Sequence, residues 1–452
     1  YGGACYIMSI SQAGHYDIQE CILKSSSGVE IPDFEKQWVS IQLHENIFSN
    51  GMHGELTVVD TNYLPMNMPL TGQDFITLKF TTPDIEEQPI IDHVFYITQL
   101  LAREELSNGA ITYTFKLISP ETLRDNRVRV TSSYTDTPSE VIENVLKNLL
   151  KSTKNMTIEG TTGIRKYVSP YSRPFDFIKS LTRESVSSKT SSPHYLFYES
   201  TKGYHFVTTD YLYSVDRVAK FEPSDSSLLP HGMRDIEKDL NNILSYNISD
   251  STNTVAAARG GMLGSRLIVY NIFNKNYELT DHDYLRDFNN FNRINENPIY
   301  NDNEIEEGKK IGSFPNSNIN LHPTSKSDGI DARYNENLTD NQSEKWLLPL
   351  RSKIMELSMG QSITLTVHGR ADIAVGDKVH ITLPITGKTH GDSEIDKVFE
   401  GDCLVTHLKH VFENVTKEHL IHMTATQDAI PHSYDIIADS TEPKKQGTIT
   451  KV

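Results

Sequence analysis

The stretch HVFYITQLLAREELSNGAITYTFKLISPE, residues 93–121, aligns without a gap with GDCLVTHLKHVFENVTKEHLIHMTATQDA, residues 401–429. Each stretch contains two segments of alternating apolar and polar residues joined by a short turn, which is the pattern of a β-hairpin. At this offset of 308 residues the identical positions are Thr98 with Thr406, Leu100 with Leu408, and Glu105 with Glu413. We predict that the chain holds two copies of one β unit, although two unrelated amphipathic hairpins could align as well.

The apolar positions of the two hairpins agree better than the identities do. Because alternation puts every second residue of a strand on one face, matched positions would be buried in both copies. The predicted buried pairs are Phe95 with Cys403, Ile97 with Val405, Tyr113 with Ile421, and Phe115 with Met423.

A glycine turn and a further strand precede each hairpin. They lie in LTGQDFITLKFTTP, residues 70–83, and in AVGDKVHITLPIT, residues 374–386. Gly72 and Gly376 are 304 residues apart, so we expect the second copy to have four extra residues between its strands.

Composition and charge narrow the class of protein. The 452 residues are enough for about three domains. A net charge of −17 argues against a nucleic-acid clamp, because phosphates would be repelled. Three cysteines, Cys5, Cys21 and Cys403, give neither a disulfide framework nor a zinc spacing. No apolar run approaches the ~18 residues of a membrane span, so we expect no membrane insertion.

The strand and helix patterns predict a mainly β chain with α+β insertions. We assign an N-terminal arm to residues 1–30 and a first antiparallel β-barrel tube domain to residues 31–120. In this domain Val39, Ile41 and Leu43 should share one apolar face.

An α+β middle domain is predicted for residues 121–236. The segment TDTPSEVIENVLKNLLK should begin a helix at a capping box, with Thr137 as the cap, Pro138 at the first position and Glu140 completing the box. SRPFDFIKSLTRES should form a second helix, and YLFYESTKGYHFVT should form a hairpin.

The β pattern returns in residues 237–261 and 346–430, which we assign to a second β-barrel tube domain similar to the first. WLLPLRSKIMEL should lead back into its strands. Residues 262–345 form a polar insertion, and residues 431–452 form a C-terminal tail. We expect the insertion to be ordered by its aromatic residues Tyr270, Phe273, Tyr277, Tyr284, Phe288 and Phe291.

Segments spread along the chain also carry a resemblance to a known family. They are SIQLHENIFSNGMHGELTVVDTNYLPMNMPLTGQDFITLKF near the start, SRPFDFIKSLTRESV and YLFYESTKGYHFVT in the middle, and ITLTVHGRADIAVGDKVHITLP and GDCLVTHLKHVFE near the end. This ordered set resembles the baseplate hub protein of contractile-tailed bacteriophages and, more distantly, the hub portion of type VI secretion spikes.

The resemblance implies a homotrimer whose two barrel domains per chain form a pseudo-sixfold ring. A central spike protein would bind one face, and the tail-tube initiator and other baseplate proteins would bind the rest. The ring would then be a structural symmetry adaptor between a sixfold tail tube and a threefold spike. A trimer would carry three times −17, or −51, and carboxylates facing the lumen would let DNA pass without specific binding. The implied location is a virion tail baseplate assembled in the host cytoplasm.

Two histidine pairs suggest a metal site. His407 and His410 are three residues apart, as are His419 and His422. On strands, residues at this spacing point to opposite faces, so only cross-strand combinations could bind a metal. We therefore predict no metal site.

The other motifs are equally weak evidence for a binding or catalytic site. ARGGMLGS, residues 258–265, lacks the lysine of a phosphate-binding loop and should be a flexible turn. Glu86 and Glu87 lie between prolines and should be solvated. We predict no catalytic residue and no cofactor. The alternatives are an all-β carbohydrate-binding or adhesin module of a tail fibre, and a cell-wall hydrolase whose two carboxylates need not be near in sequence.

Overall fold

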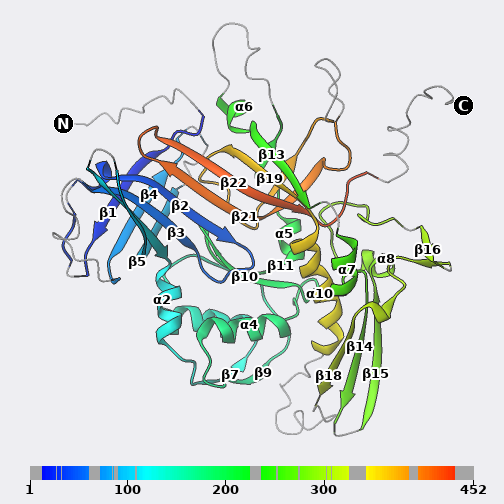
Figure 1. The fold of residues 1–452 in the computed structure, drawn as a ribbon. Helices are drawn as coiled ribbons and strands as arrows, with labels where there is room; N and C mark the ends of the chain where they lie inside the picture. Colours follow the sequence, from blue (N-terminus) through cyan, green and yellow to red (C-terminus); the bar gives the residue numbers. More distant parts are fainter. Residues whose placement is uncertain are drawn as a thin grey trace, which may run out of the picture.

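The computed structural model describes residues 13–432, apart from residues 27, 32, 61–71, 84, 86–89, 107–108, 224–235, 251–252, 273–274, 302, 307, 325–342 and 386–394. Its largest element is a twelve-stranded sheet that crosses the upper half of Figure 1. The first half of this sheet contains β1 (Asp17–Lys24), β2 (Trp38–Asn46), β3 (His53–Asp60), β4 (Phe75–Thr81), β5 (Ile90–Glu105) and β6 (Ile111–Ile118). The second half contains β12 (Ala219–Phe221), β13 (Ile243–Asp250), β19 (Gln361–His368), β20 (Lys378–Ile381), β21 (Gly401–Glu413) and β22 (Glu418–Gln427).

The two halves form one open sheet rather than two closed barrels. The hydrogen-bonded order is β1-β4-β5-β6-β3-β2-β21-β22-β19-β13, with β20 also paired to β21 and β12 to β20. Within the described residues, β1 and β13 end this path, so the prediction of a closed barrel in each half is not met by a single chain. The physical reason is that β2 of the first half pairs with β21 of the second half. The backbone N–H and C=O groups that could have closed either half into a barrel are therefore used in the contact between the halves.

The predicted repeat of the hairpins is confirmed in their register. Leu100 of β5 lies opposite Phe115 of β6, and 308 residues later Leu408 of β21 lies opposite Met423 of β22. Each long strand also carries a β-bulge, and the bulged residues are Thr98 and Thr406. Since a bulge is a specific irregularity, its recurrence at the matched threonine distinguishes a repeat from two unrelated hairpins.

The strands flanking the hairpins repeat as well. Trp38 of β2 lies opposite Val58 of β3, and Ile243 of β13 lies opposite Val367 of β19. A bulge follows the first residue of β2 and of β13 alike. Therefore β13 corresponds to β2 at an offset of 205 residues as far as Ile248, where a second bulge in β13 adds one residue, and β19 corresponds to β3 at an offset of 309.

The glycine turns repeat, but the strands that follow them match at an offset one residue smaller than predicted. Gly72 and Gly376 both have positive φ, 76° and 87°. However, the pairing of β4 with β5 and of β20 with β21 matches the strands at an offset of 303 rather than 304. The difference arises because Asp74 follows its glycine by two residues, whereas Asp377 follows its glycine directly. The second copy therefore has five extra residues before its hairpin, not four.

These two glycines provide a matched test of the turns. Alanine at Gly72 would have its Cβ 3.6 Å from the nearest neighbour, so we expect only the cost of a left-handed backbone, about 1–2 kcal/mol. At Gly376 the same Cβ would lie 2.0 Å from the Tyr198 hydroxyl. We therefore expect Gly376→Ala to lower the free energy of unfolding more than Gly72→Ala does, as measured by urea denaturation. Equal losses would contradict this reading.

Equivalent positions of the two halves are buried, as the alternation predicted. All eight residues in the four matched pairs Phe95/Cys403, Ile97/Val405, Tyr113/Ile421 and Phe115/Met423 are inaccessible to solvent. They belong to two separate apolar clusters, one under each half of the sheet. On β2 the buried face holds Trp38, Ile41 and Leu43, because the bulge turns Val39 out of the row predicted for it.

The N-terminal assignment omitted a strand. Residues 17–24, predicted to be part of an arm, form β1, which pairs with β4 and buries Cys21 and Leu23. Its polar composition concealed it, because only the last residues of the strand enter the core.

The middle part of the chain lies beneath the sheet (Figure 1). It contains α2 (Pro120–Arg127), β7 (Ser133–Asp136), α3 (Pro138–Asn144), β8 (Met156–Ile158), β9 (Arg165–Val168), α4 (Pro174–Glu184), β10 (Tyr195–Ser200), β11 (Gly203–Thr208) and α5 (Thr209–Ser214). The predicted capping box is present at Thr137 and Glu140, and α3 continues as a π-helical turn over Val145–Leu149. Both predicted helices and the predicted hairpin are confirmed.

The described residues of the polar insertion form regular elements. They are β14 (Gly264–Asn271), β15 (Asn276–Asp283), α8 (Tyr284–Asp287), β16 (Glu304–Glu306), β17 (Lys309–Lys310) and β18 (Ile319–Thr324). Before the insertion, α6 (Ile236–Leu240) precedes β13 and α7 (Thr254–Gly260) follows it. Tyr284 and Phe288 are buried as predicted, and Phe291 is half-buried. Tyr270 and Tyr277 are exposed, contrary to the expectation, and Phe273 lies outside the described residues.

The segment WLLPLRSKIMEL lies within a helix, α10 (Ser343–Met359), which the strand prediction missed. Pro349 lies inside this helix, where it removes one backbone N–H and usually breaks the element. Leu348 and Leu357 are buried, so tertiary packing maintains the helix despite the proline.

Candidate assembly interface

The two halves of the sheet meet along an antiparallel strand pair. Pairing runs from Ser40 opposite Glu413 to Asn46 opposite His407. Only the second part of β21 takes part, because residues 401–404 of β21 pair on the same side with β20. We call this strand pair the internal joint.

Glu45 is the buried carboxylate of the internal joint. Its oxygens accept the backbone N–H groups of Val375 at 3.0 Å and Thr201 at 3.2 Å, and one of them lies 3.3 Å from Nε2 of His410. Burial alone would raise the pKa of Glu45, but the contacts with His410, Val375 and Thr201 outweigh it and leave the pKa lowered. Glu45 therefore ties β2 of the first half to β21 and to the turn before β20 in the second half, and to the turn of the hairpin β10–β11.

The histidine motifs do not form a metal centre. His410 and His419 meet across the hairpin, with Nδ1 of His410 3.0 Å from Nε2 of His419, and both are buried. His407 and His422 lie on the opposite face of the strands, as the spacing predicted. No group of three potential ligands occurs in the part of the chain that the structure describes. Burial and the neighbouring His410 hold the pKa of His419 well below its usual value, so its ring stays neutral.

A charged cluster joins the middle module to the first half of the sheet. The Lys154 ammonium lies 2.7 Å from Glu121 and also contacts Glu199. The second oxygen of Glu199 accepts the backbone N–H of Met52 at 2.8 Å and the hydroxyl of Ser119 at 2.5 Å. Burial opposes the charge on Lys154, yet the two carboxylates raise its pKa.

A second buried cluster holds α10 against the second half of the sheet. The Lys353 ammonium lies 2.6 Å from Asp428 and 3.2 Å from Glu356. Arg293 contacts Glu356 and lies 3.7 Å from Asp428. The guanidinium of Arg293 also stacks over the Phe288 ring at 4.3 Å. These four charges compensate one another, and no local sequence pattern indicates them because they come from three distant segments.

Besides the outer edge of β1, two further edges of the large sheet lack a strand partner among the described residues. One is the outer edge of β13, and the other is the β4-side edge of residues 99–105, where β5 extends past β4. Large apolar side chains are exposed at both, since Leu100 is 48% exposed, Leu101 44% and Leu244 43%. Long exposed apolar edges are sites at which another chain can add a strand.

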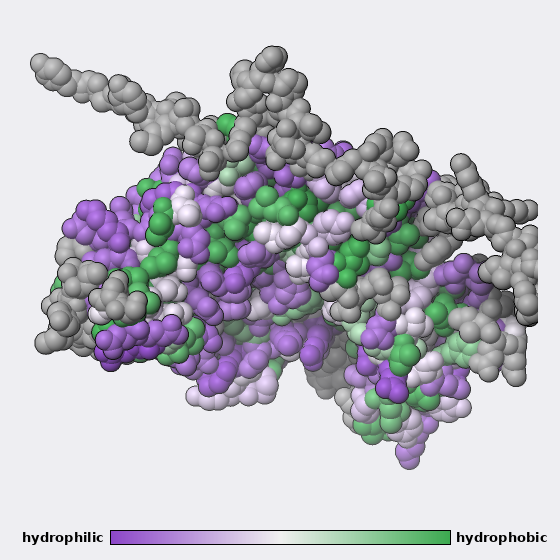
Figure 2. Space-filling view, turned by 45° about the horizontal axis from the view of Figure 1, so that its top comes forward, coloured by the Kyte–Doolittle hydropathy of each residue, from purple (hydrophilic) through white to green (hydrophobic). Residues whose placement is uncertain are grey.

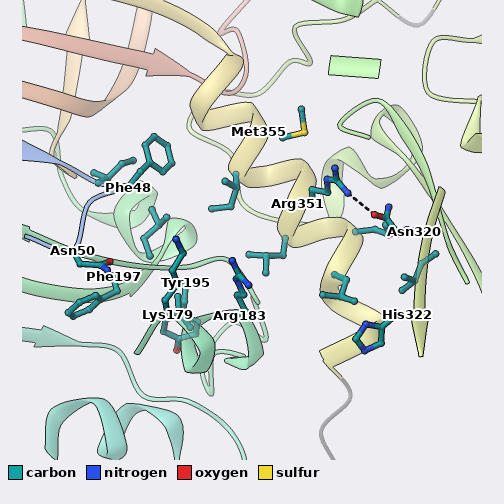
Figure 3. A pocket seen from close by; sticks show the side chains of 18 of the residues that line it. Phe48, Asn50, Lys179, Arg183, Tyr195, Phe197, Asn320, His322, Arg351 and Met355 are labelled. Carbon is teal, nitrogen blue, oxygen red and sulfur yellow. Dashed lines mark hydrogen bonds between the residues drawn. The ribbon is translucent and has the colours of Figure 1, made fainter. Parts of the chain in front are cut away.

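A groove separates the middle module from α10 and β18 (Figure 3). Its volume is about 730 Å³, and its walls carry Phe48, Phe197 and Leu321. Lys179 and Arg183 of α4 lie on one side, and Arg351 of α10, which donates to Asn320 at 2.7 Å, lies on the other. None of the described lining residues is acidic, although the chain is strongly acidic overall.

The sheet β15-β14-β18 of the insertion presents an apolar face. This sheet forms the lobe at the lower right of Figure 1, and Figure 2 shows hydrophobic patches on that lobe. The exposed residues that pairing places on this face are Tyr270, Tyr277, Leu279, Ile319 and Leu321. Both the groove and this face are surfaces that could receive another protein.

The remaining sequence motifs supply no site. ARGGMLGS spans the end of α7 and the start of β14, with Gly261 in the left-handed conformation that ends the helix. Glu86, Glu87 and Cys5 lie outside the described residues. Cys21 and Cys403 are free thiols, and burial raises the pKa of Cys21 to about 12. Among the described helices, none combines the length and apolarity needed to span a bilayer.

Two solved structures of tail proteins share the overall fold of this chain. The chain is similar over 92% of its length to the tail protein from Neisseria meningitidis MC58, with a TM-score of 0.53 and 9% identity, covering 98% of that chain. It is also similar over 91% of its length to the 43 kDa tail protein of prophage MuSo2 from Shewanella oneidensis, with a TM-score of 0.50 and 10% identity, covering all of that chain.

A weaker similarity, with a TM-score of 0.41 and 11% identity, relates 93% of the chain to 77% of an E. coli component of the type VI secretion system. No family model and no curated protein matches the sequence. The two tail proteins confirm the predicted resemblance to phage tail proteins at the level of the fold.

Proposed function

We propose that this protein is the structural baseplate hub of a contractile phage tail and has no catalytic role. The observation that carries the proposal is the internal joint: two β units with the same strand order and with matching bulges at Thr98 and Thr406 lie edge to edge in one chain. If the same edge contact also linked chains, three chains would present six nearly equivalent β units. Such a ring could match a sixfold tail tube on one side and a threefold spike on the other.

In this proposal the predicted domain division has functional meaning. The two tube domains, residues 31–120 and residues 237–261 with 346–430, build the ring, joined by β1 from the N-terminal region. The middle domain, residues 121–236, supports the ring from outside. The insertion, residues 262–345, offers its apolar sheet face to a neighbouring baseplate protein. The particle would belong to the virion tail baseplate and assemble in the host cytoplasm.

The free face of the central strands would line the DNA channel. This face lies opposite the two apolar cores and carries His44, His53, His407 and His422 among threonines, with few carboxylates. Burial is the main reason that the pKa of each of these four histidines is lowered, that of His44 to about 4. With these histidines neutral, the charged groups near them on this face are Lys409, Lys116 and Glu55. A lining with so few cations gives phosphates little to bind, so weak adhesion of DNA would come from the neutral histidines rather than from the carboxylates expected at first.

The proposal is tested by the mass and shape of the purified protein. We expect a particle of three 51.1 kDa chains in light scattering and a central hole in electron-microscopy class averages. The exposed-charge variant Arg183→Glu, in the groove far from the sheet edges, should leave this mass unchanged. A monomer at all concentrations, or a compact trimer without a hole, would overturn the proposal.

A further inference from the structure

The repeat assigns a counterpart to each strand of the internal joint. β13 is the counterpart of β2, and β5 is the counterpart of β21. Within one chain these counterparts lie far apart, with β13 and β5 on opposite sides of the internal joint in Figure 1. In the internal joint, β2 pairs through one edge with β21. The equivalent edge of β13, and the equivalent edge of residues 99–105 of β5, have no strand partner among the described residues.

We propose that β13 of one chain pairs antiparallel with residues 99–105 of β5 in a second copy, which reproduces the internal joint between chains. This inference rests on the proposed ring and names the surfaces that close it. Each chain has one edge of each kind, so the contact is heterologous and must close into a ring or grow as a filament.

The burial of matched leucines supports this partner. Leu408 is 2% exposed at the internal joint, whereas its counterpart Leu100 is 48% exposed at the unpaired edge. Both side chains project from the core-facing side of their strands, opposite Met423 and Phe115. A second copy of β13 at this edge would cover Leu100 as β2 covers Leu408.

The internal joint also sets the register. Glu45 lies opposite Leu408, which is matched by Leu100, and His44 lies opposite Lys409, which is matched by Ala102. A second bulge in β13, between Ile248 and Asp250, makes Asp250 the counterpart of His44, so Asp250 should face Ala102.

After Leu100, β5 has a further bulge at Leu101, which β21 lacks. Because of this extra residue, Ala102 matches Lys409 and Arg103 matches His410 in the pairing with the neighbouring strand.

After that bulge, Arg103 faces the core side, where its guanidinium lies 5.8 Å from the centre of the Tyr113 ring. Ile248 packs against the core of the second half, so it should lie opposite Arg103. The next pair, Asn247 of one chain and Glu104 of the other, should then meet on the polar face.

Disulfide formation tests this register. We expect Asn247→Cys combined with Glu104→Cys to give covalent dimers and trimers on oxidation, because directly opposed residues can meet the short Cβ–Cβ distance of a disulfide. The matched control is Asn247→Cys with Ala102→Cys, which shares the face but is displaced by two residues, and it should give at least tenfold less product. The two single variants Asn247→Cys and Glu104→Cys measure any background from Cys5.

The outcomes separate this inference from the proposed function. Covalent trimers from the opposed pair alone support both. A trimeric ring without that disulfide, or equal linkage of both pairs, overturns the edge pairing or its register and leaves the hub proposal standing. A monomer overturns both.

A charge placed in the edge gives a second readout. Leu100→Lys should convert the particle to monomers, with at least a tenfold loss of assembled material. Unfolding of the monomer should change little, because the side chain is half exposed there. Leu321→Lys, on the apolar face of the insertion, is the matched control and should assemble normally. Normal assembly of Leu100→Lys would overturn the inference.

Discussion

Replacing Lys353 with methionine is expected to destabilise the protein by about 3–5 kcal/mol, because it leaves buried carboxylates without their cation. Lys353 is almost fully buried and contacts both Asp428 and Glu356. Arg293 remains near both carboxylates but already contacts Glu356 and cannot replace a second positive charge. The cluster joins α10 and residue 293 to the end of β22, so the insertion should loosen from the sheet first.

Urea denaturation followed by tryptophan fluorescence and by circular dichroism would measure this loss. Lys147→Met is the matched control, because Lys147 forms an exposed pair with Glu143 one helical turn away. Exposed pairs at this spacing contribute only about 0.3–0.5 kcal/mol. A loss of similar size in both variants would show that the cluster around Lys353 does not hold the fold together.

Replacing Lys154 with methionine is expected to cost a similar amount at pH 7, about 3–5 kcal/mol, and to make stability depend on pH in a different way. In the native protein Lys154 is the main reason that the pKa of Glu121 is lowered from 4.5 despite burial. A carboxyl whose folded pKa is lowered contributes stability above its ordinary pKa and loses it as the pH falls. Without Lys154 the buried carboxyls should instead bind protons more readily than in the unfolded chain.

The difference in unfolding free energy between the native protein and Lys154→Met should therefore shrink as the pH falls from 7 towards 4.5. Denaturant unfolding at both pH values would measure it, with Lys147→Met expected to show little change. A difference that is the same at both pH values would contradict the assignment of Lys154 as the partner of Glu121 and Glu199. Since Glu199 also binds Met52 and Ser119, the variant tests the attachment of the middle module to the sheet.

Local patterns predicted much of the fold. The alternation in residues 93–121 and 401–429 identified two hairpins with the correct buried residues and the correct offset. The capping box at Thr137 located the start of α3. These features are readable because turn chemistry, capping and the period of a strand depend on residues close in sequence.

The errors came from features that local patterns do not contain. Pro349 argued against the helix α10, which persists because its buried leucines and Lys353 pack against distant segments. The bulge in β2 exchanged Val39 for Trp38 in the core, and a strand's alternation does not reveal where a bulge occurs. The exposed tyrosines of the insertion show that aromatic content predicts burial only when a covering layer is present.

Two matching β units and an α+β module with a capped helix could be predicted from local sequence patterns alone. They could be predicted because strand period and helix caps are properties of neighbouring residues. Three features are seen only in the folded chain: the units share one open sheet through β2 and β21, Glu45, Lys154 and Lys353 lie in buried polar clusters, and β13 and residues 99–105 of β5 have apolar edges without a strand partner among the described residues. Those features depend on main-chain and charge contacts between residues hundreds of positions apart, whose partners are fixed only when the whole chain has folded.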